Sequence, residues 1–411
     1  MTPLLLRGGR LADPAGAAPA AGDLLVADRT IAAIGAGLEP PGGARVIDAG
    51  GLVIGPALMD SAVFRADPAA AAAGGATVQL LMPDPAGPLD DPALVERATR
   101  LGKPSLWVHP LAAATRRLEG RELAELALLK AAGAVAVATG RVGVADSAVM
   151  HRLLRYAAGL DLLVVTHAED SALTAGAVLT EGTVATRLGL PAAPAAAEAL
   201  AIARDLRLAE EAGARLHIAC VSTAEGVALV RAAKARGLDV TAGTAPPCFL
   251  LNETAALGWR SFARLSPPLR AEADRLAVRE GLADGSIDMI ASRHDPRTTE
   301  EKRLPFADAA PGAADAGLLL PLALTLVHDG LIGLARLFGL LSAAPAARFG
   351  LAGGRLAPGA PADLVLLAPD APWVVRAEEL PGLGRNTPFD GLPLLGQVRG
   401  LLKGGEWVLR P

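Results

Sequence analysis

The stretch that decides the fold is Arg215–Ala242, RLHIACVSTAEGVALVRAAKARGLDVTA. It begins with an apolar run of strand length, Arg215–Val221. An amphipathic segment, Thr223–Arg236, and a second apolar run, Asp239–Ala242, follow. A helix between two strands brings the chain back to the starting edge of a sheet, so the strands pair in parallel. The stretch therefore predicts a strand, a helix and a strand of one parallel sheet.

The same order repeats on both sides of this stretch, within residues 52–350. Further strands are predicted at Thr77–Met82, Ser105–Val108, Ala134–Ala138, Leu162–His167 and Ile287–Ala291, and further helices at Arg121–Ala132, Ser147–Ala158 and Ala195–Ala212. About eight such units in about 300 residues are typical of a (β/α)8 TIM-like barrel, which makes the chain α/β in class. An open, doubly wound sheet is the alternative.

Both ends of the chain are rich in short strand-like runs separated by glycine and proline. The runs are Leu4–Arg7, Asp23–Ala27, Thr30–Ile34 and Arg45–Ile47 at one end, and Asp363–Leu367, Trp373–Arg376, Val398–Lys403 and Glu406–Leu409 at the other. Neither set is large enough to complete a sheet alone. We therefore expect residues 1–51 and 351–411 to form one composite β-sandwich domain.

The composition excludes several classes of function. The 411 residues are 52% hydrophobic, and 39 basic against 43 acidic side chains give a net charge of -4. This balance predicts neither a nucleic-acid partner nor a membrane surface. The two cysteines, Cys220 and Cys248, are too few for a disulfide framework, and neither a signal peptide nor a membrane span is evident. We expect a cytoplasmic protein.

Catalytic residues of such a barrel lie at the carboxyl ends of its strands, so motifs there carry the functional signal. Pro56–Phe64 follows the first candidate strand and resembles the Pro-Gly-Leu-(Ile/Val)-Asp-x-His-x-His motif of the dihydroorotase family, in the amidohydrolase superfamily. Further collinear similarities to that family are Thr166–Asp170, Glu181-Gly182, Leu188–Pro191, Cys220–Ala224, Ser266–Arg270, Gly281–Asp288 and Asn386–Phe389 with Gly391. The resemblance covers nearly the whole chain and implies the barrel and the composite domain.

The departures from the family pattern lie where the resemblance implies metal ligands. Ala62 and Phe64 stand in place of two histidines, Thr139 in the region of a carboxylate, Cys220 in place of a further histidine, and Arg293 in place of a catalytic aspartate. A catalytic zinc needs about three imidazole, carboxylate or thiolate ligands. Only His167 remains of that set. We therefore expect neither a bound metal nor another cofactor, and no catalytic residue.

Four further residues form the expected vestigial pocket: His167, Asp84, His294 and Asn386. His167 is predicted as a hydrogen-bonded relic, Cys220 as a small buried hydrophobe, and Asn386 either as a pocket residue or as a link between the two domains. We also hypothesise that Arg293 neutralises Asp84 or Glu169 in place of the metal, which Arg293→Asp would test through stability.

The resemblance extends to inactive dihydroorotase-like chains that assemble with aspartate carbamoyltransferase. It implies a non-catalytic structural subunit of pyrimidine biosynthesis, and we expect a homo-oligomer. The first alternative is an active dihydroorotase or other cyclic-amide hydrolase with a site rebuilt around His167, Cys220, His294 and Asp84. The second is a regulator that binds a ligand in the old pocket.

Overall fold

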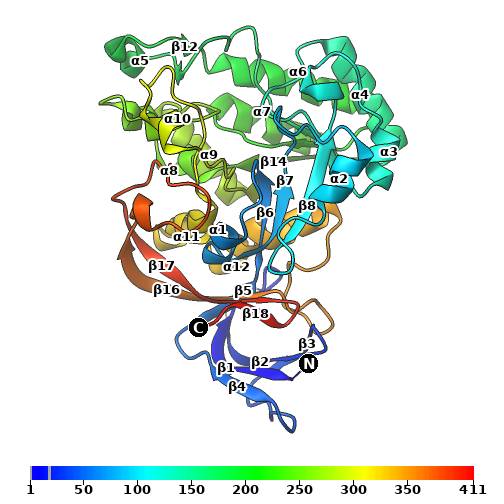
Figure 1. Ribbon diagram of the computed structural model, residues 1–411, viewed down its shortest axis with the longest axis vertical. Coiled ribbons are helices and arrows are strands. Elements are labelled where there is room, and N and C mark those ends of the chain that lie inside the picture. Colours follow the sequence, from blue (N-terminus) through cyan, green and yellow to red (C-terminus); the bar gives the residue numbers. More distant parts are fainter. Residues whose placement is uncertain (1, 17–19) are drawn as a thin grey trace.

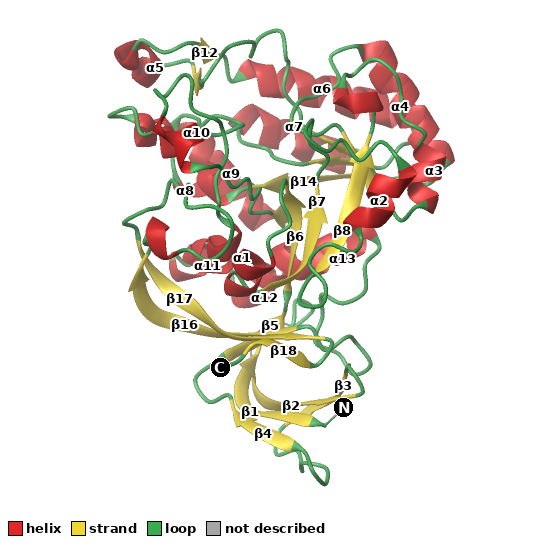
Figure 2. Cartoon of the chain, viewed as in Figure 1, coloured by secondary structure: helices red, strands yellow, loops and turns green. Residues whose placement is uncertain are grey.

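The structure is a computed structural model that describes residues 2–16 and 20–411, and it has two parts (Figure 1). A barrel surrounded by helices forms the larger part. A strand-rich domain lies beneath it, and both chain termini belong to that domain. The carboxyl ends of the barrel strands point away from this small domain (Figure 2). The barrel mouth and the small domain are therefore at opposite ends of the barrel.

Eight parallel strands form the barrel, each paired with the next along the chain. They are β6 (Leu58–Val63), β7 (Ala76–Leu81), β8 (Trp107–Ala113), β9 (Ala136–Ala138), β10 (Val164–Thr166), β13 (Leu216–Ile218), β14 (Val240–Thr244) and β15 (Met289–Ile290). The first and last strands meet beyond their ends, where the Phe64 amide donates to the His294 carbonyl at 2.9 Å. The predicted (β/α)8 barrel is confirmed, nearly closed, and the open sheet is excluded.

Helices cover the outside of the barrel. They are α1 (Pro68–Ala73), α2 (Pro92–Ala98), α3 (Leu126–Ala131), α4 (Ser147–Gly159), α6 (Ala196–Ala212), α7 (Ala224–Ala235), α9 (Glu272–Asp284), α11 (Leu319–His328), α12 (Leu334–Phe338) and α13 (Ala344–Phe349). Side-chain caps fix where several begin: Asp146 accepts the Ala148 amide at α4, and Thr223 accepts the Gly226 amide at α7. None of the helices in the described ranges is both long and apolar enough to cross a bilayer.

Two apolar layers explain why most residues of the barrel strands are hydrophobic. At β10, Val165 and the preceding Leu163 belong to the cluster inside the barrel, whereas Val164 belongs to the cluster between the barrel and its helices. Alternate residues of a strand point to opposite faces, and both faces are buried here. Short elements lie over the mouth: β11 (Leu179–Thr180), α5 (Thr183–Leu188), β12 (Ala192–Ala193), α8 (Pro246–Leu250) and α10 (Thr299–Arg303).

The small domain contains one sheet built from both ends of the chain. Its strands are β1 (Leu4–Leu11), β2 (Ala20–Ala27), β3 (Thr30–Gly35), β4 (Arg45–Asp48), β5 (Val53–Pro56), β16 (Leu364–Val374), β17 (Pro393–Lys403) and β18 (Glu406–Leu409). Antiparallel pairing of β5 with β16 joins the two ends. The sandwich packing and the boundaries at 51/52 and 350/351 stay predictions, and β5 extends this sheet to Pro56.

Two local predictions were wrong. Pro56–Phe64 was expected to follow the first barrel strand, but its residues Leu58–Val63 are that strand, β6. A separate strand was expected at Trp373–Arg376, but β16 runs on to Val374. Pro369 and Pro372 lie within β16, and the register between β16 and β17 is irregular between Ala368 and Pro372.

Candidate functional site

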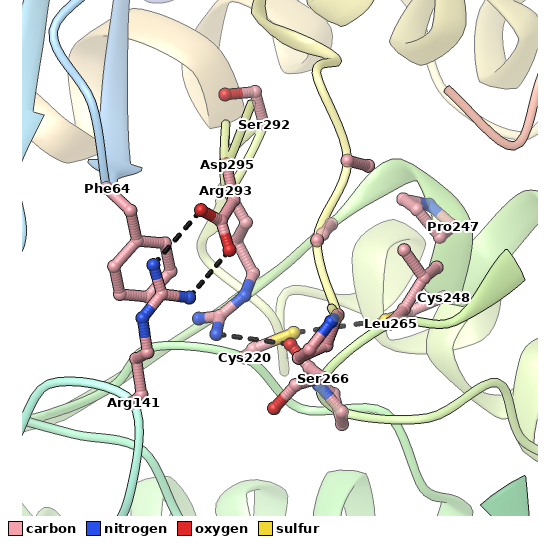
Figure 3. Close-up of a pocket in the computed structure, with 15 residues that line it drawn as sticks. Phe64, Arg141, Cys220, Pro247, Cys248, Leu265, Ser266, Ser292, Arg293 and Asp295 are labelled. Carbon is pink, nitrogen blue, oxygen red and sulfur yellow. Dashed lines mark hydrogen bonds and ion pairs between the residues drawn. The ribbon is translucent and has the colours of Figure 1, made fainter. Parts of the chain in front are cut away.

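A small cavity lined by both apolar and polar side chains lies at the mouth of the barrel (Figure 3). Its volume is about 40 Å³, which is far below the about 300 Å³ at which small-molecule sites begin. Its lining includes residues that follow β6, β9, β13 and β15: Phe64, Arg141, Cys220 and Arg293, with Cys248 of α8. The mouth thus brings together three of the sequence-predicted positions, Phe64, Cys220 and Arg293.

The strand β6 carries Asp60 and Ala62, and Phe64 follows it directly. Ala62 and Phe64 are buried in the cluster inside the barrel, and the Phe64 ring faces the cavity (Figure 3). Asp60 is fully buried and accepts the Ser292 amide at 2.9 Å and the Ser292 hydroxyl. Burial raises the pKa of Asp60 to about 6. Asp60 therefore joins β6 to the residues after β15 rather than facing the cavity.

Arg141 is the cation that dominates the mouth, and the sequence analysis did not single it out. Its Nε donates to Asp84 at 2.5 Å, and its Nη1 and Nη2 donate to the two oxygens of Asp295 at 2.6 and 3.0 Å. Its guanidinium carbon lies 3.9 Å from the centre of the Phe64 ring, within the range of a cation–π contact. Burial raises the pKa of Asp84, but the Ala86 amide and Arg141 outweigh it, so the pKa is lowered.

Arg293 does not make the ion pairs that we hypothesised for it. It has a positive φ of 51°, its Nη2 donates only to the Ser266 carbonyl at 3.4 Å, and its guanidinium lies 5.5 Å from the Phe64 ring. Its Nη1 has no hydrogen-bond partner within the described part of the chain. For Asp84 the hypothesis is corrected: Arg141, whose side chain reaches Asp84 from the loop after β9, supplies the neutralising charge. For Glu169, Arg293 acts only through its charge, as one of the groups that lower the pKa of that carboxyl.

His167 and Thr139 are neighbours on adjacent strand ends. The His167 amide donates to the Thr139 hydroxyl at 3.0 Å, and its Nε2 lies 3.2 Å from a carboxylate oxygen of Glu169. Burial raises the pKa of Glu169, but His167, Arg270 and Arg293 outweigh it and lower the pKa. His167 is therefore a buried, hydrogen-bonded imidazole, and its Nε2 is engaged by a carboxylate.

His294 and Asn386 lie in the walls around the mouth. His294 directs Nε2 to Asp67 at 3.3 Å and accepts the Ala316 amide on Nδ1 at 3.3 Å. The side-chain oxygen of Asn386, Oδ1, accepts the Arg297 backbone amide at 2.9 Å. Its side-chain nitrogen, Nδ2, donates to the backbone carbonyls of residues 295 and 312. Asn386 thereby ties the segment after the barrel to the loop after β15, which favours the linking role over a pocket role.

A buried network behind the mouth was also missed by the sequence analysis. Glu198 of α6 accepts the amides of Ser222 and Thr223, each at 2.9 Å, and the Thr223 hydroxyl at 2.8 Å. Arg270 reaches the same carboxylate at 3.5 Å and donates to the Ser222 hydroxyl at 2.9 Å. The network holds the loop after β13, so the Val-Ser-Thr and Pro-Pro-Leu-Arg motifs have a structural explanation here.

The side chains at the mouth do not fit the zinc that the family resemblance implies. Within residues 2–16 and 20–411, no three His, Cys, Asp or Glu side chains are placed to hold one ion. Ala62 and Phe64 have no lone pair to donate, and Arg141 and Arg293 bring positive charge to the cavity. Guanidinium groups stay protonated at neutral pH and repel a cation.

The chain is similar in sequence to proteins named dihydroorotase and similar in fold to a hydantoinase. A family model described as "Dihydro-orotase-like" matches residues 62–226. Over 409 residues, the chain is 40% identical to a Geobacter sp. (strain M21) protein named dihydroorotase, and 96% of each chain is covered. A Pelotomaculum thermopropionicum protein of the same name is 40% identical over 421 residues. An L-hydantoinase (dihydropyrimidinase) structure from Arthrobacter aurescens matches with a TM-score of 0.89 at 26% identity, covering 100% of this chain and 96% of that one.

Proposed function

Because the chain belongs to the dihydroorotase family, we propose that it is a member without hydrolytic activity that serves as a structural subunit in pyrimidine biosynthesis. One observation carries the proposal: a guanidinium, Arg141, lies between the carboxylates of Asp84 and Asp295. The side chains of Ala62 and Phe64, at positions where the family resemblance implies metal ligands, are apolar.

The chemistry of hydrolysis explains why these replacements matter. A cyclic amide is attacked at neutral pH by hydroxide, which a bound metal generates by lowering the pKa of its water. Arg293 occupies the position of the proton-accepting aspartate and has no acceptor atom. Asp84 and Asp295 are engaged by Arg141, and His294 faces Asp67. These contacts disfavour the rebuilt-hydrolase alternative, which requires Asp84 and His294 at the cavity.

The direct test is hydrolysis of dihydroorotate by the purified full chain with added Zn²⁺. The Geobacter relative named dihydroorotase, assayed beside it, is the positive control. We expect a rate no higher than that of a protein-free blank. Zinc-dependent turnover that a chelator removes would contradict the proposal and favour the rebuilt hydrolase.

The proposed partner is aspartate carbamoyltransferase, and the proposed assembly is cytoplasmic and contains more than one copy of this chain. Support comes from the family resemblance together with a nearly closed barrel and a composite sheet in a chain whose described residues contain no set of metal ligands at the mouth. Co-purification of the tagged chain with the carbamoyltransferase from its own source, followed by size measurement in solution, tests this. Elution of the two proteins as separate monomers would contradict it.

A further inference from the structure

The two cysteines of the chain are brought together at the wall of the mouth cavity. Cys220 follows β13, and Cys248 lies in α8, 28 positions later. Their sulfur atoms are 3.9 Å apart (Figure 3). Cys220 is buried, Cys248 is partly exposed, and both are unpaired thiols that line the cavity. The 411-residue sequence has only two thiols, and the fold places them close enough to react with each other.

We propose that Cys220 and Cys248 are a redox-active dithiol that takes a small peroxide as oxidant and forms a disulfide across the wall of the cavity. The Cys248 thiolate attacks one peroxide oxygen, the O–O bond breaks, and hydroxide leaves, which gives a sulfenic acid. The Cys220 sulfur then attacks the Cys248 sulfur, and the S–O bond breaks. The leaving hydroxide takes the Cys220 proton. Two thiols and hydrogen peroxide thus become one disulfide and two waters, and the sulfurs supply both electrons.

The environment favours Cys248 as the attacking group. The hydrogen bond between the two thiols lowers the pKa of Cys248 and raises that of Cys220, and burial adds to the latter. Arg293, with its Nη1 unpartnered among the described residues, lines the same cavity and favours a thiolate there. Glu198 acts in the opposite direction on both thiols. The less buried residue of the two, Cys248, is thus also the one whose thiolate is favoured.

The proposed disulfide connects the end of β13 to α8. A bridge between positions 28 apart restricts the unfolded chain, so the oxidised protein is expected to unfold at a higher temperature than the reduced one. In a reducing compartment such a disulfide is transient and forms only while oxidant is present, as is usual for redox-sensing cytosolic disulfides. The proposal does not rest on the loss of hydrolysis, because neither thiol needs a metal or a substrate.

The test treats the full chain with hydrogen peroxide and then measures its intact mass and the thiols that can be titrated after unfolding. We expect both thiols to disappear, a mass lower by about 2 Da from the loss of two hydrogens, and full reversal by dithiothreitol. Cys220→Ser and Cys248→Ser, the matched controls, should form no disulfide within one chain. Two intact thiols after treatment, oxygen added without a disulfide, or a bridge only between two chains would overturn the proposal.

Discussion

Replacement of Arg141 by alanine tests the ionic arrangement that distinguishes this barrel mouth. The substitution removes three short charge-assisted hydrogen bonds, at 2.5, 2.6 and 3.0 Å, and the contact with the Phe64 ring. Removing one partner of a buried ion pair typically costs about 3–5 kcal/mol. Two features reduce the cost: the Arg141 side chain is 25% exposed, and Asp295 keeps Arg297 at 2.8 Å. We expect a loss of about 2 kcal/mol in the free energy of unfolding.

The matched control is Arg207→Ala. Arg207 also donates to a carboxylate, that of Glu210 at 3.1 Å, but its side chain is 79% exposed. Exposed pairs contribute less than about 1 kcal/mol. Urea unfolding of the wild type and both variants, followed by circular dichroism, compares the two losses. If Arg141→Ala costs no more than Arg207→Ala, the arginine does not neutralise a buried acidic site and the reasoning is wrong.

The pH dependence of the stability difference between the wild type and Arg141→Ala tests the ion pair independently. The pKa of Asp84 is lowered in the folded protein, so the stabilisation by Arg141 through Asp84 is fully present above the unfolded value of about 3.9. It is lost as the pH falls through the lower folded pKa. The difference between wild type and Arg141→Ala should therefore be constant from pH 8 to 5 and shrink below about pH 4. A difference that grows on acidification would contradict the ion pair.

Three further predictions concern the buried network, a buried carboxyl and the assembly. Glu198→Ala should cost about 3–5 kcal/mol, because it leaves buried Arg270 with only the longer contact to Glu169 at 3.9 Å, whereas exposed Glu211→Ala should cost less than about 1 kcal/mol in urea unfolding. Burial raises the pKa of Asp315 to about 7, so this carboxyl should lower wild-type stability as the pH rises from about 4 to 7. In pH-dependent unfolding, Asp315→Asn should make that fall smaller and leave the part that comes from Asp60, whose pKa is raised to about 6. Addition of this chain to the carbamoyltransferase from its own source should increase that enzyme's heat stability, and an unchanged inactivation rate would oppose the partnership.

Much of the barrel could be predicted because its strands are buried on both faces. The strands β10 and β13 are mainly apolar, with Thr166 and His217 as their polar members, and glycines follow the helices between them, as Gly213 follows α6. The first barrel strand, β6, was harder to recognise because Asp60 and Ser61 interrupt its apolar residues. Asp60 is tolerated there because Ser292, 232 positions later, satisfies its carboxylate. Two residues so far apart in the sequence form no local motif from which their hydrogen bonds could be predicted.

Three residues of the candidate site, Phe64, Cys220 and Arg293, were identified from the sequence, but the ion pairs at the mouth were not. Ala62 and Phe64 show directly in the sequence that two donors are missing, since no conformation gives them a lone pair. The ion pairs of Arg141 depend on which loops meet at the mouth, because its partners Asp84 and Asp295 are 57 and 154 positions away. The only local signal was a basic residue directly after Thr139-Gly140, where the family resemblance implies acidic residues.

The zinc content of the purified full chain, measured by mass spectrometry after incubation with excess Zn²⁺ and gel filtration, tests the central claim most directly. With apolar side chains at Ala62 and Phe64 and a guanidinium from Arg141 at the mouth, we predict less than about 0.1 zinc ion per chain, well short of a stoichiometric site. Retention of one or two zinc ions per chain would contradict the claim that this barrel mouth cannot hold a catalytic metal.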